Sequence, residues 1–180
     1  MHFRPVKSSE SHAIQQLFVD VFSSSEGEQE GLVLGGFVKQ LIETTDHADL
    51  FGFVADDGQQ VVGAVFFSRL RWDGQDSLNA FILSPMAVRT DRQQTGIGQS
   101  LVRHGLDELR KAGVAFVTTY GDPAFYGKVG FQSITPDRIT APFPLSQPEG
   151  WLGQSLTAQP IASLPGKCRC VGALNQRDLW

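Results

Sequence analysis

Residues 83–98 read LSPMAVRTDRQQTGIG, and this stretch decides how the rest of the chain is interpreted. It begins as an apolar strand that ends at Val88, continues as a polar loop, and places Gly96 and Gly98 at the start of an amphipathic helix expected over 96–112. Glycines let backbone N–H groups approach a ligand closely, and the first-turn amides of a helix, together with its dipole, attract an anion. The stretch predicts a phosphate or pyrophosphate site at this helix N-terminus, although the glycines would also suit a tight strand-to-helix turn.

Two familiar nucleotide motifs do not fit this site. The dinucleotide fingerprint needs a third glycine where Leu101 stands and an acidic residue about twenty residues further on, where residues 116–120 are apolar or neutral. The P-loop needs a lysine that the segment lacks, and the near match over 121–128 has one residue too many between its glycines. A Rossmann dinucleotide site and a P-loop ATPase are both excluded.

Hydrophobic periodicity places helices and strands on both sides of this stretch. Ser9 is expected to cap a helix whose apolar face consists of Ala13, Ile14, Leu17, Phe18, Val21 and Phe22. The other expected elements are strands over 3–6, 50–55, 61–72, 78–88 and 115–120, helices over 28–44 and 123–128, a strand from Phe131 and a closing strand over 168–174. The strands within 50–88 should form an antiparallel meander, and the prolines from 136 to 165 predict an irregular arm.

This order of elements predicts an α/β fold, with a mixed, mostly antiparallel sheet flanked by helices and an irregular proline-rich C-terminal arm. The chain has 180 residues, of which 41% are hydrophobic and 19% charged, as expected for a single domain. We expect the core to span about 3–135, and the arm with its closing strand about 136–180.

Composition also excludes several classes of partner. The net charge of −4 leaves no excess of positive charge for a nucleic-acid backbone, so nucleic acid is not expected as a partner. No apolar run approaches the roughly 20 residues of a membrane span, and no signal-type segment opens the chain. We therefore expect a cytoplasmic protein without membrane contact. Cys168 and Cys170 are expected to be inert strand residues, no metal site is indicated, and all four histidines should be solvated.

The segment from Gln93 to Gly98 resembles the coenzyme A motif of the Gcn5-related N-acetyltransferases (GNAT), which reads Gln or Arg, two residues, Gly, one residue, then Gly or Ala. Residues 125–131, FYGKVGF, resemble the second signature of this family, a Tyr followed by Gly-Phe. Residues 84–88 and 121–123 are particularly similar to the YhbS-like branch of predicted N-acetyltransferases. The resemblance covers about residues 3–131 and weakens beyond Gln132.

The resemblance implies an enzyme that uses acetyl-CoA. In such a site the backbone of Met86, Ala87 and Val88 pairs with the pantetheine arm like an added strand, and the N–H of Val88 stabilises the oxyanion. The resemblance further assigns Tyr126 as the general acid facing the coenzyme sulfur, where the alternative is a packing aromatic. Cofactor contacts are expected from Gln93, Gln94, Thr95, Gly96, Ile97 and Gly98 at the pyrophosphate, and from Asp122 and Tyr126.

The acceptor is less well defined. The expected strand over 78–83 lacks the carboxylate that several family members place there, which leaves the general base unassigned. Glu26, Glu28 and Glu30 lie in the helix-to-helix region that lines the acceptor site in relatives, so they are candidates to attract a cationic amine. The alternative for each is a solvated, acidic helix start.

The function expected from these residues is direct transfer of an acetyl group to a primary amine of a small molecule or peptide, without a covalent enzyme intermediate, by a monomer or homodimer. Two alternatives remain open. The chain could be a non-catalytic acyl-CoA sensor, because one fold hosts many functions, or an acyltransferase with another acyl donor or an O-linked acceptor.

Overall fold

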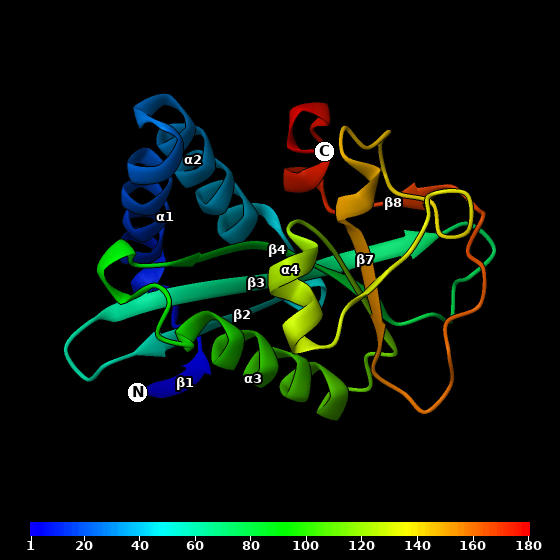
Figure 1. The fold of residues 1–180 in the computed structure, drawn as a ribbon, viewed down its shortest axis with the longest axis horizontal. Helices are drawn as coiled ribbons and strands as arrows, with labels where there is room; N and C mark the ends of the chain where they lie inside the picture. The colour runs from blue at the N-terminus through cyan, green and yellow to red at the C-terminus, as the bar shows by residue number, and fades with distance from the viewer. The chain divides into compact units, whose positions relative to one another are not determined.

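Strands β3 (Val61–Trp72) and β4 (Ala80–Val88), both labelled in Figure 1, each contribute residues to both of the units into which the chain divides. The computed structural model describes every residue from 1 to 180. The first unit comprises residues 1–66 and 85–105, and the second comprises residues 67–84 and 106–180. Helix α3 (Ile97–Lys111) is also shared between them, so each unit is described by itself.

The first unit contains the strand order β1-β2-β3-β4. Strand β1 (His2–Pro5) pairs antiparallel with β2 (Leu50–Asp56), with Phe3 opposite Ala55. Arg4 on β1 forms ion pairs of 2.6 Å with both Glu10 and Asp56. These contacts hold β1 against β2 and against the chain that leads into the first helix.

Two helices of the first unit, α1 (Ser11–Glu26) and α2 (Glu28–Thr44), lie side by side and are joined at Gly27, whose φ is +106° (Figure 1). Their approach depends on Gly31 and Gly35 of α2. A Cβ at Gly31 would stand 2.0 Å from Ser23 Oγ, and one at Gly35 would stand 2.3 Å from Val19 Cγ2. The buried faces that this packing creates consist of Ile14, Leu17, Phe18 and Val21 on α1 and Phe37, Val38 and Leu41 on α2.

The second unit contains the strand order β3-β4-β5-β7-β6. Strand β5 (Phe116–Tyr120) is parallel to β4 and antiparallel to β7 (Trp151–Ser155), which also pairs antiparallel with β6 (Gln132–Ser133). Strand β8 (Cys168–Arg169) is antiparallel to the end of β3. Short helix α4 (Pro123–Tyr126) follows β5 and continues as a 3₁₀ turn over Gly127–Val129. The predicted mixed, mostly antiparallel sheet with flanking helices is confirmed.

Several details of the prediction were wrong. Ser9 is not the N-cap of α1, because Ser8–Glu10 forms a 3₁₀ turn and Glu10 immediately precedes the helix. The proline-rich arm is not irregular throughout, since Trp151–Ser155 forms β7 with a fully buried Trp151. Of the expected closing strand only Cys168–Arg169 pairs, whereas Gly172–Leu174 forms a 3₁₀ turn.

The histidine prediction fails at one position. His2, His12 and His47 are exposed, but His104 of α3 packs against the rings of Phe3 and Phe53, with ring centroids 6.0 and 5.4 Å away. Both cysteines are free, and burial raises the pKa of the Cys168 and Cys170 thiols, the latter to about 11. Neither thiol is ionised near neutral pH, as inert cysteines require. None of the helices combines the length and apolar character needed to cross a bilayer.

Candidate active site

The parallel ladder between β4 and β5 ends before β4 does. Its last pair is Leu83 opposite Thr119, and β4 continues to Val88. At the far end the N–H of Arg89 donates to Val62 O on β3 at 2.9 Å, so β3 holds one edge of this continuation. Successive residues of a strand direct their backbone groups to opposite edges, so the N–H groups of Met86 and Val88 face the edge away from β3. This edge can accept an extended ligand by strand addition.

The loop after β4 is held in an unusual backbone conformation. Gln94 has φ +60° and Gly96 has φ +84°, and Thr95 Oγ1 donates to Arg92 O at 2.6 Å. The first bond of α3 runs from Ser100 N–H to Gly96 O at 3.0 Å, and no hydrogen bond within the chain uses the backbone N–H groups of residues 94–99. Consecutive free amides at a helix N-terminus form an anion site, so the loop has the chemistry that a pyrophosphate requires.

Ion pairs at the protein surface fix this loop. Arg89 pairs with Asp91 at 3.0 Å, and Arg92 reaches Asp57 on the turn before β3 at 3.3 Å. The side-chain hydrogen bond from Arg89 lowers the pKa of Asp91, and hydrogen bonds from the backbone N–H groups of Gln59 and Gln60 lower the pKa of Asp57. Exposed pairs of this kind contribute little to stability, so their effect is to order the loop.

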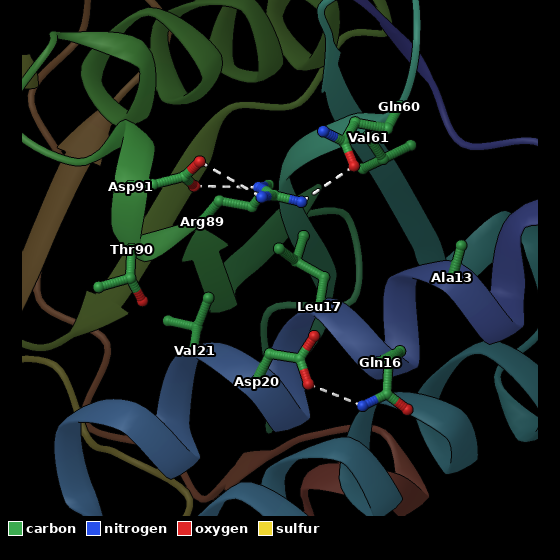
Figure 2. A pocket seen from close by; sticks show the side chains of 10 residues that line it. All are labelled: Ala13, Gln16, Leu17, Asp20, Val21, Gln60, Val61, Arg89, Thr90 and Asp91. Atoms are coloured by element: carbon green, nitrogen blue, oxygen red, sulfur yellow. Dashed lines mark hydrogen bonds and ion pairs between the residues drawn. The ribbon is translucent and has the colours of Figure 1, made fainter.

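A cavity of about 580 Å³ lies in the first unit between α1, the start of β3 and residues 89–91 (Figure 2). Arg89 spans one wall of it, because its guanidinium donates to Asp91 and, at 2.9 Å, to Gln60 Oε1. On α1, Asp20 accepts from Gln16 Nε2 at 2.7 Å and forms no ion pair. Arg89 interacts electrostatically with Asp91 and also with Asp20, so the two carboxylates and one guanidinium of the lining leave the cavity with one net negative charge. Its volume falls in the range of small-molecule sites, about 300–1,000 Å³.

In the second unit, Tyr126 at the end of α4 is held by aromatic and backbone contacts. Its ring centroid lies 5.0 Å from that of Phe125 and 5.7 Å from that of Phe131, and a Cβ at Gly121 would stand 2.7 Å from Tyr126 Cε2. Asp122 caps α4 by accepting from Ala124 N–H at 2.8 Å. Burial raises the pKa of Tyr126, and a hydrogen bond with Thr119 acts in the opposite direction. The phenol is therefore protonated at neutral pH, as a general acid must be.

The other tyrosine has a different role. The hydroxyl of Tyr120 accepts from Gln147 N–H at 2.7 Å and shares a 2.9 Å hydrogen bond with Ser146, and its ring stacks on Trp180 at 6.4 Å. Tyr120 thus ties the C-terminal part of the chain to the end of β5.

The structure groups the predicted site residues in three places. Residues 86–88 and 93–98 form one continuous region of the first unit, and Gln93 Nε2 donates to Val88 O at 3.0 Å within it. Tyr126 and Asp122 belong to the second unit. Glu26, Glu28 and Glu30 are exposed around the α1–α2 junction, where their carboxylates make no hydrogen bond or ion pair.

Sequence reasoning missed Asp20, Arg89 and Thr119. Asp20 is a lone acidic residue between apolar positions of α1, and Thr119 is one of three neighbouring hydroxyl-bearing residues of β5, so no motif marks either of them. Arg89 directly follows the strand whose end, Met86 to Val88, is expected to hold the pantetheine arm. This position next to the expected cofactor site was the signal that could have identified Arg89.

Known protein families and structures are similar to this chain over most of its length. Residues 2–134 match the family model described as an acetyltransferase (GNAT) domain. The chain is 34% identical over 138 residues to YjhQ, an uncharacterized N-acetyltransferase of Escherichia coli K12, covering 74% of this chain and 76% of that protein. It is 43% identical over 82 residues to YhbS of the same organism, covering 45% of this chain and 48% of YhbS.

Two solved structures are similar along nearly the whole chain. The crystal structure of Escherichia coli YhbS in complex with CoA superposes with a TM-score of 0.79 at 26% identity, covering 97% of this chain and 92% of that one. A GNAT family acetyltransferase of Brucella melitensis in complex with acetyl-CoA superposes with a TM-score of 0.75 at 24% identity, covering 96% and 97%. The resemblance inferred from residues 93–98 and 125–131 is confirmed.

Proposed function

This chain belongs to the acetyltransferase (GNAT) family, and from that premise we propose that it transfers an acetyl group from acetyl-CoA directly to a primary amine of a small molecule or peptide. The observation that carries the proposal is the continuity of the open β4 edge with the free amides of residues 94–99. The open strand edge suits the amide-containing pantetheine arm, and the free amides that follow it in the chain suit the pyrophosphate, so the two features lie in the same order as these two parts of acetyl-CoA. A cytoplasmic location and a monomeric or homodimeric state remain predictions.

Acetyl-CoA as donor is supported by the CoA and acetyl-CoA complexes of the similar structures. In this chain the backbone of Met86, Ala87 and Val88 would hold the pantetheine, and the loop 93–98 the pyrophosphate. Calorimetric titration tests this donor directly. Gly98→Glu should abolish detectable binding through bulk and negative charge, whereas Gly36→Glu, on an exposed and open face of α2, should bind normally. Absence of wild-type binding at millimolar acetyl-CoA would refute both an enzyme and an acyl-CoA sensor.

The reaction needs three functions, which we assign as follows. The amine nitrogen attacks the thioester carbon and forms the C–N bond, while the Val88 N–H donates to the developing oxyanion. When the C–S bond breaks, its electron pair stays on sulfur, which takes the phenolic proton of Tyr126. The proton lost by the nitrogen restores the phenol through water. The ordinary pKa is about 10 for a phenol and about 8.5 for a thiol, and burial raises the pKa of Tyr126 further, so this proton transfer is uphill and benefits from a group that stabilises the phenolate.

A cationic acceptor is supported by the charge distribution of the first unit. Asp20 gives the cavity on α1 its unbalanced negative charge, and Glu26, Glu28 and Glu30 add three free carboxylates at the α1–α2 junction. Leu17 and Val21 provide an apolar surface in the same cavity, seen beside Arg89 in Figure 2. We propose a primary amine with an apolar carbon skeleton as the acceptor, and Asp20 as the residue that holds its charge.

Release of the CoA thiol, measured with a panel of amines, distinguishes the enzyme from its alternatives. Tyr126→Phe keeps the ring and removes the hydroxyl, so kcat should fall by about 10² to 10⁴ while acetyl-CoA affinity changes little. Tight acetyl-CoA binding without turnover on any amine or alcohol would indicate a sensor. Preference for a longer acyl donor or for alcohols would indicate a different acyltransferase. Unchanged turnover in Tyr126→Phe would remove this phenol from the mechanism.

A further inference from the structure

Two adjacent threonines of β5 are fully buried but differ in their bonding. Thr119 Oγ1 donates to Leu83 O at 3.0 Å, across the last pair of the parallel ladder between β4 and β5. Thr118 Oγ1 is buried without a hydrogen-bond partner. The hydroxyl of Thr119 is therefore held in place by the strand end, and Thr118 offers a neighbouring hydroxyl without such a bond.

Tyr126 lies on the face of the strand that carries Thr119, because its ring contacts Gly121, two residues further along, where a Cβ would stand 2.7 Å from Tyr126 Cε2. Burial raises the pKa of this phenol, and a hydrogen bond with Thr119 lowers it. The neighbouring ring of Phe131 helps to hold the phenol in position. A threonine hydroxyl has one proton and two lone pairs. While its proton points to Leu83 O, Thr119 can only accept from the phenol. When the phenol has lost its proton, the same hydroxyl can rotate and donate to the phenolate. A single side chain thus fits both states of Tyr126.

We propose that Thr119 is a positioning residue that orients the Tyr126 hydroxyl and stabilises its phenolate as the proton leaves for the coenzyme sulfur. The inference rests on the proposed function, in which Tyr126 is the general acid. The phenolic O–H turns from Thr119 Oγ1 to the sulfur, and the sulfur takes the proton. The electron pair of the O–H bond stays on the phenolate oxygen, and the Thr119 proton turns from Leu83 O to that oxygen. After the phenolate regains a proton from the acetylated nitrogen through water, Thr119 returns to Leu83.

The surroundings of Tyr126 explain why such help is needed. Burial disfavours the charged phenolate, and the carboxylate of Asp122 disfavours it further. Among the groups that shift the pKa of Tyr126, Thr119 is the one that favours the charged form. A hydrogen bond to a charged group corresponds to roughly a 10- to 100-fold effect on rate.

The kinetic test compares Thr119→Val with Thr119→Ser, which keeps the hydroxyl, and with Thr118→Val, which removes the unbonded one. We expect Thr119→Val to lower kcat by about 10- to 100-fold while the affinity for acetyl-CoA stays nearly unchanged. Thr119→Ser should have most of the wild-type kcat, and Thr118→Val should have the wild-type kcat. In a Tyr126→Phe background, Thr119→Val should cause no further loss, because it acts through the phenol. Thr119→Ala gives a second hydroxyl-free variant if the valine variant does not fold.

A second readout needs no acceptor. The chain has two tyrosines, so Tyr120→Phe leaves Tyr126 as the sole source of a tyrosine ring-carbon NMR signal. In this background Thr119→Val should shift that signal at neutral pH and raise its titration midpoint, whereas Thr118→Val should do neither. Two results would overturn the inference: a loss of kcat from Thr119→Val that adds to the loss from Tyr126→Phe, or a Tyr126 NMR signal that Thr119→Val does not shift. Thr119 would then serve only to link β5 to β4 through its bond to Leu83 O. Full turnover in Tyr126→Phe would instead overturn the acid assignment itself.

Discussion

The side-chain amide of Gln93 donates a hydrogen bond to the backbone carbonyl of Val88 at 3.0 Å. The bond ties the loop that carries the free amides back to the end of β4. It uses the carbonyl of Val88 and leaves the N–H of the same residue available. The glutamine of the coenzyme motif is therefore a structural clamp on the strand in this chain.

Removing this clamp should affect cofactor binding before it affects chemistry. In Gln93→Ala the loop 89–96 loses its bond to β4, so we expect the Kd for acetyl-CoA to rise about tenfold, the equivalent of a lost hydrogen bond of about 1 kcal/mol or slightly more. Isothermal titration calorimetry measures this change. Gln59→Ala, on an exposed turn of the same unit, serves as the control and should leave the Kd unchanged. Equal affinity in Gln93→Ala would show that the loop is ordered without the clamp.

The acceptor preference should follow the charge of the cavity on α1. Polyamines, aminoglycosides and basic peptides should be better acceptors than acidic amino acids, because Asp20 attracts a cation and repels an anion. Asp20→Asn should raise KM for the best cationic acceptor about tenfold with a smaller effect on kcat, in steady-state measurements of thiol release. Glu43→Gln, which removes an exposed charge at the far end of α2, is the matched control. A clear preference for acidic compounds would contradict the assignment.

Because α1 packs against α2 at Gly35 but not at Gly36, substitution of these two neighbouring glycines by alanine should have opposite effects on the free energy of unfolding. Gly35→Ala places its Cβ against Val19, 2.3 Å from Cγ2, and should lower the free energy of unfolding by about 1–3 kcal/mol. Gly36→Ala meets no atom within 4 Å and should raise it by about 0.5–1 kcal/mol through helix propensity. Urea denaturation of both variants gives the comparison. Effects of the same sign would mean that the helices do not pack at Gly35.

The ion pairs of Arg4 should make stability depend on acid pH. The side-chain hydrogen bond from Arg4 lowers the pKa of Glu10 in the folded chain. A lowered carboxyl pKa contributes stability above the unfolded value of about 4.3, and this contribution is lost as pH falls through the folded value. Glu10→Gln should therefore be less stable than wild type by about 1 kcal/mol at pH 7. Thermal unfolding from pH 7 to pH 3 should show the two proteins converging at the acid end, and a constant gap would refute the pair.

Long periodic elements and the coenzyme motif could be predicted from the sequence because their signals are local. Helix α2 and strand β3 were predicted with their observed bounds, and Gly96 does adopt the positive φ that a glycine at a strand-to-helix turn favours. The strand Trp151–Ser155 could not be recognised, because it is short, contains Gly153 and follows a run of prolines. Its place in the sheet is set by pairing with β5 and β6, which no local pattern reveals.

The candidate site was predictable where backbone chemistry determines it and not where side chains from distant segments meet. For residues 93–98 the predicted anion site depends on consecutive backbone amides, which a local sequence pattern can indicate, and their role in binding a pyrophosphate stays a prediction. The position of Tyr126 on the side of β5 that carries Thr119 depends on tertiary packing, as does the position of Asp20 and Arg89 in the lining of one cavity. His104 shows the same limitation, because its position on the polar side of a helix did not reveal the two aromatic rings that cover it.

The early end of the β4–β5 ladder has a consequence for backbone protection. Along one strand, the amide protons of Ala87 and Arg89 face β3, while those of Met86 and Val88 face outward. Hydrogen–deuterium exchange should therefore alternate between slow and fast at successive residues rather than change gradually along the strand. When a pantetheine arm is bound, the alternation should disappear. The ligand then takes the place of a neighbouring strand and accepts hydrogen bonds from the outward N–H groups, so that these amides exchange as slowly as those that face β3.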